Sequence, residues 1–216
     1  MRKSSTTQRR KQLVSMMVVG ILILVLAVAG IGIHIISKYI PSKEQMNLTE
    51  YYGQPAEGEM VLVLGTDIME ERALKSGDQI YLPQDIVSTY LNQRYYWDSG
   101  NQQILYATPS SLEKFPASEA EGGEVWVRDG KVYLSLSLVQ KYTDLDFYEY
   151  QEPARVVIRH EFTGVNVATV KKDTSIRYRG GIKSPVLTEV KKGDTLIYMQ
   201  ALEDWVQVST MDGYIG

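Results

Sequence analysis

Cysteine is absent from this 216-residue chain, and histidine occurs only as His34 and His160. Without thiols the chain can form no disulfide, thiolate metal site, thiol nucleophile or lipid-modified cysteine anchor, and two histidines give almost no material for a zinc site. Phosphate loops, the G-x-S-x-G elbow and the H-E-x-x-H motif are also missing. The sequence therefore predicts no cofactor and no metal.

The charges are nearly balanced in number but unevenly distributed. With 23 basic and 26 acidic residues the net charge is −3, which disfavours non-specific nucleic-acid binding. The part from Ser37 onward has 18 basic and 26 acidic residues, a net charge of −8, whereas the first twelve residues carry five basic side chains and no acid. Those five are Arg2, Lys3, Arg9, Arg10 and Lys11.

A long apolar run follows the basic residues. Residues 13–36 contain no Asp, Glu, Lys or Arg, and a helix of this length spans the ~30 Å hydrocarbon core of a bilayer. Because basic flanks stay in the cytoplasm, we predict a cytoplasmic tail (1–12), a signal-anchor (13–36) and an extracytoplasmic remainder, in a single-pass protein of the cell membrane. A cleaved signal peptide is the alternative, since Ala27-Val28-Ala29 resembles a cleavage site, but the run exceeds a ~7–15-residue signal core.

Residues 37–59 have the composition of a linker. Two prolines and two glycines, Pro41, Gly53, Pro55 and Gly58, are separated mostly by polar residues. We interpret this segment as a tether that clears the membrane.

A repeat follows at an offset of 52 residues. Ile80–Asp98 aligns without gaps with Val132–Tyr150, and five of the nineteen aligned positions are identical. Each copy predicts a turn, a short strand, a short helix and a hairpin. Because each copy is too small to bury much alone, we expect an α+β stalk domain over 60–162 in which two repeats share one core.

Tyrosine is abundant, with fifteen residues in the chain. A sugar-stacking or partner-binding surface is one interpretation. The favoured interpretation is packing on β surfaces, because many of the tyrosines occupy equivalent repeat positions. These pairs are Tyr81/Tyr133, Tyr90/Tyr142 and Tyr96/Tyr148.

The first copy carries a family resemblance. Tyr81-Leu82-Pro83, a short helix and then Tyr96-Trp97-Asp98 before a hairpin resemble the stalk domain of Gram-positive exported proteins that is named after the N-terminal domain of copper amine oxidases. The second copy lacks the proline and the tryptophan. The resemblance implies a spacer and interaction module without copper chemistry.

Residues 166–216 alternate apolar and polar residues over several short strands. Lys192-Gly193-Asp194 and Met211-Asp212-Gly213 are turn signals between them. Five short strands at close spacing predict a small barrel.

This C-terminal segment resembles the bacterial SH3-type domain of cell-wall proteins. The resemblance rests on Ile176-Arg177, Ser184-Pro185-Val186, Lys192-Gly193-Asp194, Asp204–Val208 and Asp212–Gly216. A closing strand normally follows the last glycine in that family, so we expect a barrel that is incomplete at the C-terminus.

The resemblance implies contact with cell-wall glycan or peptide. Candidate contact residues are Arg177, Tyr178, Arg179, Trp205 and Tyr214. A core aromatic of the barrel is the favoured interpretation of Trp205.

No catalytic residue is predicted in this chain. The closest acid pairs, such as Asp144 and Asp146, lie in polar stretches typical of solvated charge. Anchor, stalk and SH3-type domain in this order resemble the front of exported family 18 glycoside hydrolases, so we expect a non-catalytic front of a larger wall-glycan hydrolase. The alternative is a stand-alone cell-wall-binding or scaffold protein. Expected partners are the membrane and the wall, with no nucleic acid.

Overall fold

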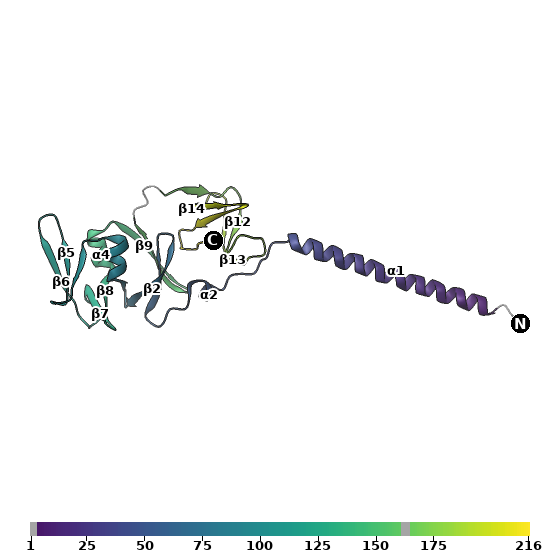
Figure 1. Ribbon diagram of the computed structural model, residues 1–216, viewed down its shortest axis with the longest axis horizontal. Coiled ribbons are helices and arrows are strands. Elements are labelled where there is room, and N and C mark those ends of the chain that lie inside the picture. The colour runs from purple at the N-terminus through teal and green to yellow at the C-terminus, as the bar shows by residue number, and fades with distance from the viewer. Residues whose placement is uncertain (1–3, 161–164) are drawn as a thin grey trace. The chain divides into compact units, whose positions relative to one another are not determined.

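The computed structural model describes residues 4–160 and 165–216 (Figure 1). They form two compact units. The first contains the N-terminal helix, the chain up to Lys43 and residues 181–184, and the second contains residues 44–180 and 185–216.

The first unit is dominated by helix α1 (Ser4–Tyr39). From Leu13 to Tyr39 it has a mean hydropathy of 2.9, and none of its most apolar stretch is buried. Its length and composition suit a membrane anchor or a signal sequence. Among the predicted topology determinants, Arg2 and Lys3 lie outside the described residues, and only the backbone is described for Arg9, Arg10 and Lys11.

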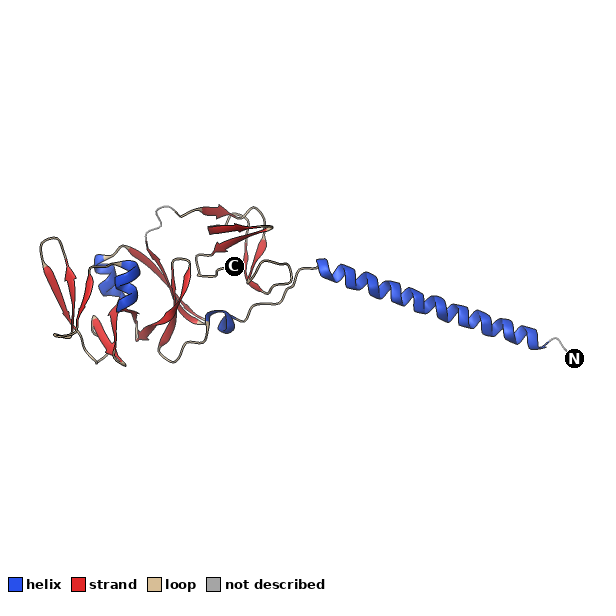
Figure 2. Ribbon diagram, in the orientation of Figure 1, coloured by secondary structure: helices blue, strands red, loops and turns tan. Residues whose placement is uncertain are grey.

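The second unit is mostly β structure, as Figure 2 shows. Its largest sheet has seven strands in the order β7-β8-β3-β2-β1-β10-β9. Neighbouring strands are antiparallel except for β1 and β10, which are parallel. The strands are β1 (Glu59–Leu64), β2 (Asp67–Ser76), β3 (Gln79–Pro83), β7 (Val125–Arg128), β8 (Lys131–Ser135), β9 (Leu145–Gln151) and β10 (Ala154–His160).

The neighbouring strands β1 and β10 are buried on both faces. Met60 and Leu62 of β1 pack into one hydrophobic cluster, whereas Val61 and Val63 pack into another. A continuous apolar run such as Met60–Leu64 is typical of a strand that is covered on both sides.

Short helices cover one face of this sheet. They are α3 (Gln84–Ile86), which continues as the π-helical turn η1 (Val87–Leu91), and α4 (Leu136–Tyr142). The side chain of Ser135 caps α4 by accepting a hydrogen bond from the Leu138 amide at 3.2 Å. Ile86 and Leu138 belong to the same hydrophobic cluster, so the regions around the two helices share one core.

The two regions of the predicted repeat have the same order of elements. β3, α3 with η1, β4 (Tyr95–Asp98) and β5 (Gln103–Ala107) occur in one, and β8, α4, β9 and β10 in the other. β3 pairs with β8 so that Leu82 lies opposite Leu134, 52 residues later. The hairpins differ: β4 and β5 form a separate sheet with β6 (Leu112–Pro116), whereas β9 and β10 join the large sheet.

The tether is shorter than the predicted 37–59. Gln45 forms a bridge with Val186, and the Asn47 side chain caps helix α2 (Leu48–Tyr52). Tyr52 is only 2% exposed. The composition of residues 37–59 resembles a linker, but Tyr51 and Tyr52 provide enough apolar surface for this segment to pack against the rest of the second unit.

The predicted core role of the repeat tyrosines is only partly right. Tyr81 and Tyr133 are buried, but Tyr90, Tyr96 and Tyr148 are exposed. In the described part of the chain, no other element covers these three rings.

Five strands form in the C-terminal segment, in two sheets. One contains β11, β14 and β15 and the other β12 and β13. The two sheets are not closed into the predicted barrel. The strands are β11 (Val167–Thr169), β12 (Thr174–Arg177), β13 (Val186–Val190), β14 (Thr195–Leu202) and β15 (Trp205–Ser209).

These strands pack on the second face of the large sheet. Val63 and Val157 share a hydrophobic cluster with Ile176, Leu187 and Val208. The predicted stalk and SH3-type regions therefore belong to one compact unit with a common core.

Candidate functional site

A groove of about 460 Å³ lies between β12 and β15. Ile176 and Val208 are buried and give it an apolar base. Its sides are formed by the residues that follow β12 and by the β14–β15 hairpin.

The structure brings four of the five predicted contact residues together in this groove. They are Arg177, Tyr178, Arg179 and Trp205. In sequence they lie on two separate strand ends, and the fold makes them neighbours.

Gly180 determines how closely the Trp205 ring approaches the β12 end. A Cβ at this position would lie 3.3 Å from both Cγ and Cδ1 of Trp205. A larger residue would push the indole away, so glycine allows the ring to lie against the backbone.

Trp205 is not the core aromatic that the sequence favoured. It is 36% exposed, and Leu202, opposite it in the hairpin, is 42% exposed. Because the sheets are not closed into a barrel, no strand among residues 4–160 and 165–216 covers this face of the indole.

Tyr214 lies elsewhere. It is 8% exposed, its ring centroid is 5.9 Å from that of Tyr52, and the Arg155 guanidinium lies 5.3 Å from its centre. Tyr214 therefore packs the C-terminal segment against α2 and β10, and it is not among the residues that line the groove.

The groove combines aromatic surface with positive charge. The Arg179 guanidinium lies 5.0 Å from the centre of the Tyr178 ring, in cation–π geometry. None of the described side chains that line the groove is acidic, although the chain beyond the membrane helix is acidic as a whole. Such a site can stack on a flat or ring-shaped ligand and donate hydrogen bonds to carboxylate or carbonyl oxygens.

Leu202 and Val206 form an exposed apolar rim of the groove between β12 and β15. Neither residue was predicted from the sequence as a contact residue. The signal that could have identified Leu202 is the β14–β15 hairpin, which places it opposite the candidate residue Trp205. Strand alternation cannot separate an exposed apolar residue from a core one when the covering element is unknown.

Two buried arginines of β10 fix the turn that follows β15. Arg159 donates to the carbonyl oxygens of Thr210 (2.7 Å), Met211 (3.2 Å) and Gly65, and burial lowers the pKa of its guanidinium. Arg155 donates to the carbonyl oxygen of Asp212 at 3.3 Å. These contacts hold the base of the groove on the large sheet.

The tyrosines that pack on this turn stay neutral. Burial raises the pKa of Tyr51 to about 12, and burial also raises the pKa of Tyr52. Tyr52 donates to the carbonyl oxygen of Gly213 at 2.9 Å. A tyrosinate here would lose that hydrogen bond and a favourable apolar environment.

The described residues contain no group of three or more His, Asp or Glu side chains that could hold a metal ion. Asp144 and Asp146 are exposed.

No protein-family model, curated protein or solved structure matches this chain.

Proposed function

We propose that this chain is a membrane-anchored, extracytoplasmic module that attaches to the bacterial cell wall through the groove between β12 and β15. The single observation that carries the proposal is the convergence of Trp205, Tyr178 and two arginines in that groove. The resemblance of the C-terminal segment to bacterial SH3-type domains supports the wall as the target.

In this proposal α1 is a retained anchor with a cytoplasmic N-terminus. Five basic residues precede its apolar part and no acid does, which is the charge pattern of a cytoplasmic flank. The groove then lies on the outer side of the membrane, where the wall is.

The middle of the chain acts as a duplicated spacer in this proposal. The shared order of elements and the pairing of Leu82 with its repeat equivalent Leu134 support a duplication. A single compact unit with two packed sheet faces gives a stiffer support than a flexible linker would.

The chain has no catalytic role in this proposal. An accessory region of a wall-glycan hydrolase and a stand-alone scaffold would use the same anchor and groove.

Wall binding is tested with the full chain in lipid nanodiscs, sedimented with purified Gram-positive sacculi. We expect retention of the wild type, and a loss of about tenfold in affinity for Trp205→Ala, because tryptophan is enriched among the few residues that contribute most of the binding energy of an interface. Tyr96→Ala is the matched control, since Tyr96 is also exposed but lies outside the groove. Retention no greater than that of an unrelated acidic nanodisc protein would reject the proposal.

Orientation is tested by protease treatment of intact Gram-positive protoplasts that express the chain. We expect digestion of the part beyond α1 before lysis. Protection until lysis would show the opposite orientation.

A further inference from the structure

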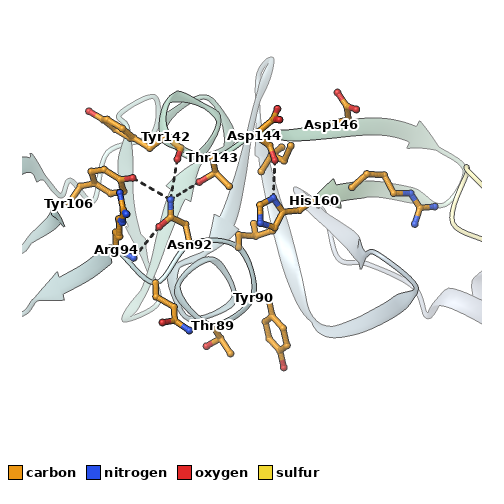
Figure 3. Close-up of a pocket in the computed structure, with 14 residues that line it drawn as sticks. Thr89, Tyr90, Asn92, Arg94, Tyr106, Tyr142, Thr143, Asp144, Asp146 and His160 are labelled. Carbon is orange, nitrogen blue, oxygen red and sulfur yellow. Dashed lines mark hydrogen bonds between the residues drawn. The ribbon is translucent and has the colours of Figure 1, made fainter. Parts of the chain in front are cut away.

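A second concavity, of about 1070 Å³, lies where the two repeat regions meet (Figure 3). It is bordered by the end of η1, the end of α4, β5, β9 and the end of β10. It shares no lining residue with the groove between β12 and β15.

Asn92 lines this concavity and is held in place by hydrogen bonds, as Figure 3 shows. Its side-chain amide donates to the Thr143 hydroxyl at 2.9 Å, to the Tyr142 carbonyl oxygen at 3.2 Å and to the Tyr106 hydroxyl at 3.3 Å. Its carbonyl oxygen accepts from the Arg94 amide at 3.1 Å. These bonds connect the end of η1 to the end of α4. The part of the concavity around Asn92, which we call its floor, is therefore preorganised.

Stacked aromatic rings support this floor. The ring centroids of Tyr106 and Tyr142 are 4.1 Å apart in a stacked arrangement. The Tyr142 hydroxyl donates to the Glu113 carboxylate, whose pKa is lowered mainly by this hydrogen bond. The floor is therefore held independently of any ligand.

Polar groups of both kinds surround the floor. In Figure 3, Asp144 and Asp146 lie on one side of Asn92, and Thr89 and Tyr90 on the opposite side. In the described part of the chain, no side-chain hydrogen bond or ion pair occupies the carboxylates of the two aspartates or the guanidinium of Arg94. The rim thus offers both acceptors and donors.

The aromatic part of the rim is exposed. Tyr90 is 56% exposed, whereas the apolar lining residues Leu91 and Leu145 are buried. An exposed ring among polar groups can stack on the apolar face of a sugar ring, whereas a peptide would need open apolar subsites for its side chains.

We propose that this concavity binds a neutral oligosaccharide. Opposite charges on the rim disfavour a strongly anionic or cationic ligand, and hydroxyl groups can both donate to Asp144 and Asp146 and accept from Arg94. The volume lies just above the ~300–1,000 Å³ range of ligand sites, which suits several sugar rings.

Calorimetric titration of the full chain in lipid nanodiscs tests this site, since nanodiscs avoid sugar-headed detergents. The probes are the tetramer of N-acetylglucosamine, maltotetraose and a neutral tetrapeptide. We expect at least one oligosaccharide to bind with a Kd of about 1 mM or lower, and the tetrapeptide not to bind.

Two variants and two controls locate the binding. Tyr90→Ala and Asp146→Asn should each weaken oligosaccharide binding about tenfold, which is about 1.4 kcal/mol. Both side chains are exposed, so the fold should remain. Tyr96→Ala should change nothing. Trp205→Ala should lower retention on sacculi while leaving oligosaccharide binding intact.

The outcomes separate this site from the groove. No binding of either oligosaccharide at about 10 mM overturns the proposal, as does binding of the tetrapeptide alone. Binding that is lost in Trp205→Ala but kept in Tyr90→Ala would also overturn it, because the groove would then be the saccharide site.

Discussion

The two hairpins of the repeat regions begin from similar sequence positions and reach different environments. β5 alternates buried and half-buried or exposed residues, as a strand with one covered face does. β10 is buried at every position from Arg155 to Arg159, because helices cover one face and the C-terminal strands cover the other. The two regions thus keep the same order of elements, while one of them has a second packing surface.

Two arginines of β10 bind the C-terminal segment to this second packing surface. Positions 155 and 159 correspond, at the offset of 52, to Gln103 and Ala107 in β5. Neither of these holds another segment as Arg155 and Arg159 hold the turn after β15.

The largest effect should come from Arg159→Ala. The substitution removes the side chain that donates to the carbonyl oxygens of Gly65 and Met211, and one of the donors to that of Thr210, which also accepts from the Gly213 amide. We expect it to lower the free energy of unfolding by about 3 kcal/mol. Urea unfolding of the full chain in nanodiscs, followed by tryptophan fluorescence, measures this value. Ala107→Ser at the equivalent position is the control and should change it little. A loss below about 1 kcal/mol for Arg159→Ala would mean that the turn is held by other contacts.

The second prediction compares the loss in the free energy of unfolding for Val157→Ala with that for Leu105→Ala at the equivalent repeat position. Val157 is fully buried between the sheet and the C-terminal strands, whereas Leu105 is half-buried. We expect a loss of about 2 kcal/mol for Val157→Ala and less for Leu105→Ala, although leucine loses more atoms. The same unfolding measurement applies. Equal losses would show that the two hairpins are covered alike.

A third difference concerns alkaline pH. Burial raises the pKa of Tyr95, whose hydroxyl donates to the Leu138 carbonyl oxygen at 2.8 Å, whereas the equivalent Phe147 cannot ionise. Because the pKa is higher in the folded state, the stabilisation by the neutral phenol is complete below the unfolded value of about 10 and is lost as the pH rises further.

This difference is measured from melting temperatures at pH 8 and pH 11. Tyr95→Phe should cost about 1 kcal/mol at pH 8, through the lost hydrogen bond, and should show a smaller fall between the two pH values than the wild type. An identical fall in both proteins would exclude Tyr95 as a source of alkaline sensitivity.

The smallest effect concerns Glu149 of β9. The Lys75 ammonium donates to its carboxylate, and this hydrogen bond lowers the pKa of Glu149. The resulting stabilisation is present above the unfolded pKa and is lost as the pH falls through the folded one. Lys75→Gln should cost less than about 1 kcal/mol at pH 7, because the pair is partly solvated, and nothing at pH 2. A cost that is unchanged at pH 2 would point to packing of the lysine stem instead.

Local patterns in the sequence were enough for several elements. The apolar run from Leu13 predicted α1, and the offset of 52 correctly predicted short helices after β3 and β8. Strands in the C-terminal segment followed from alternation and turn residues. For the groove, the sequence pointed to four residues that the structure places together.

Other features depended on contacts between distant segments. The segment around Tyr52 has linker-like neighbours but packs on β10, and Tyr214 is buried by the same cluster. Trp205 is exposed because the sheets leave one side of the hairpin open. The concavity around Asn92 joins residues from both repeat regions, and their spacing in the sequence does not reveal it.

The apolar helix, the charge asymmetry around it and the short elements of the repeat and of the C-terminal segment follow from the sequence, because they depend on composition and on periods of two to four residues. Contacts between distant segments determine which hairpin joins the large sheet, which aromatic rings are buried and where the two concavities form. Burial is a property of both partners in a contact, and a local pattern describes only one of them.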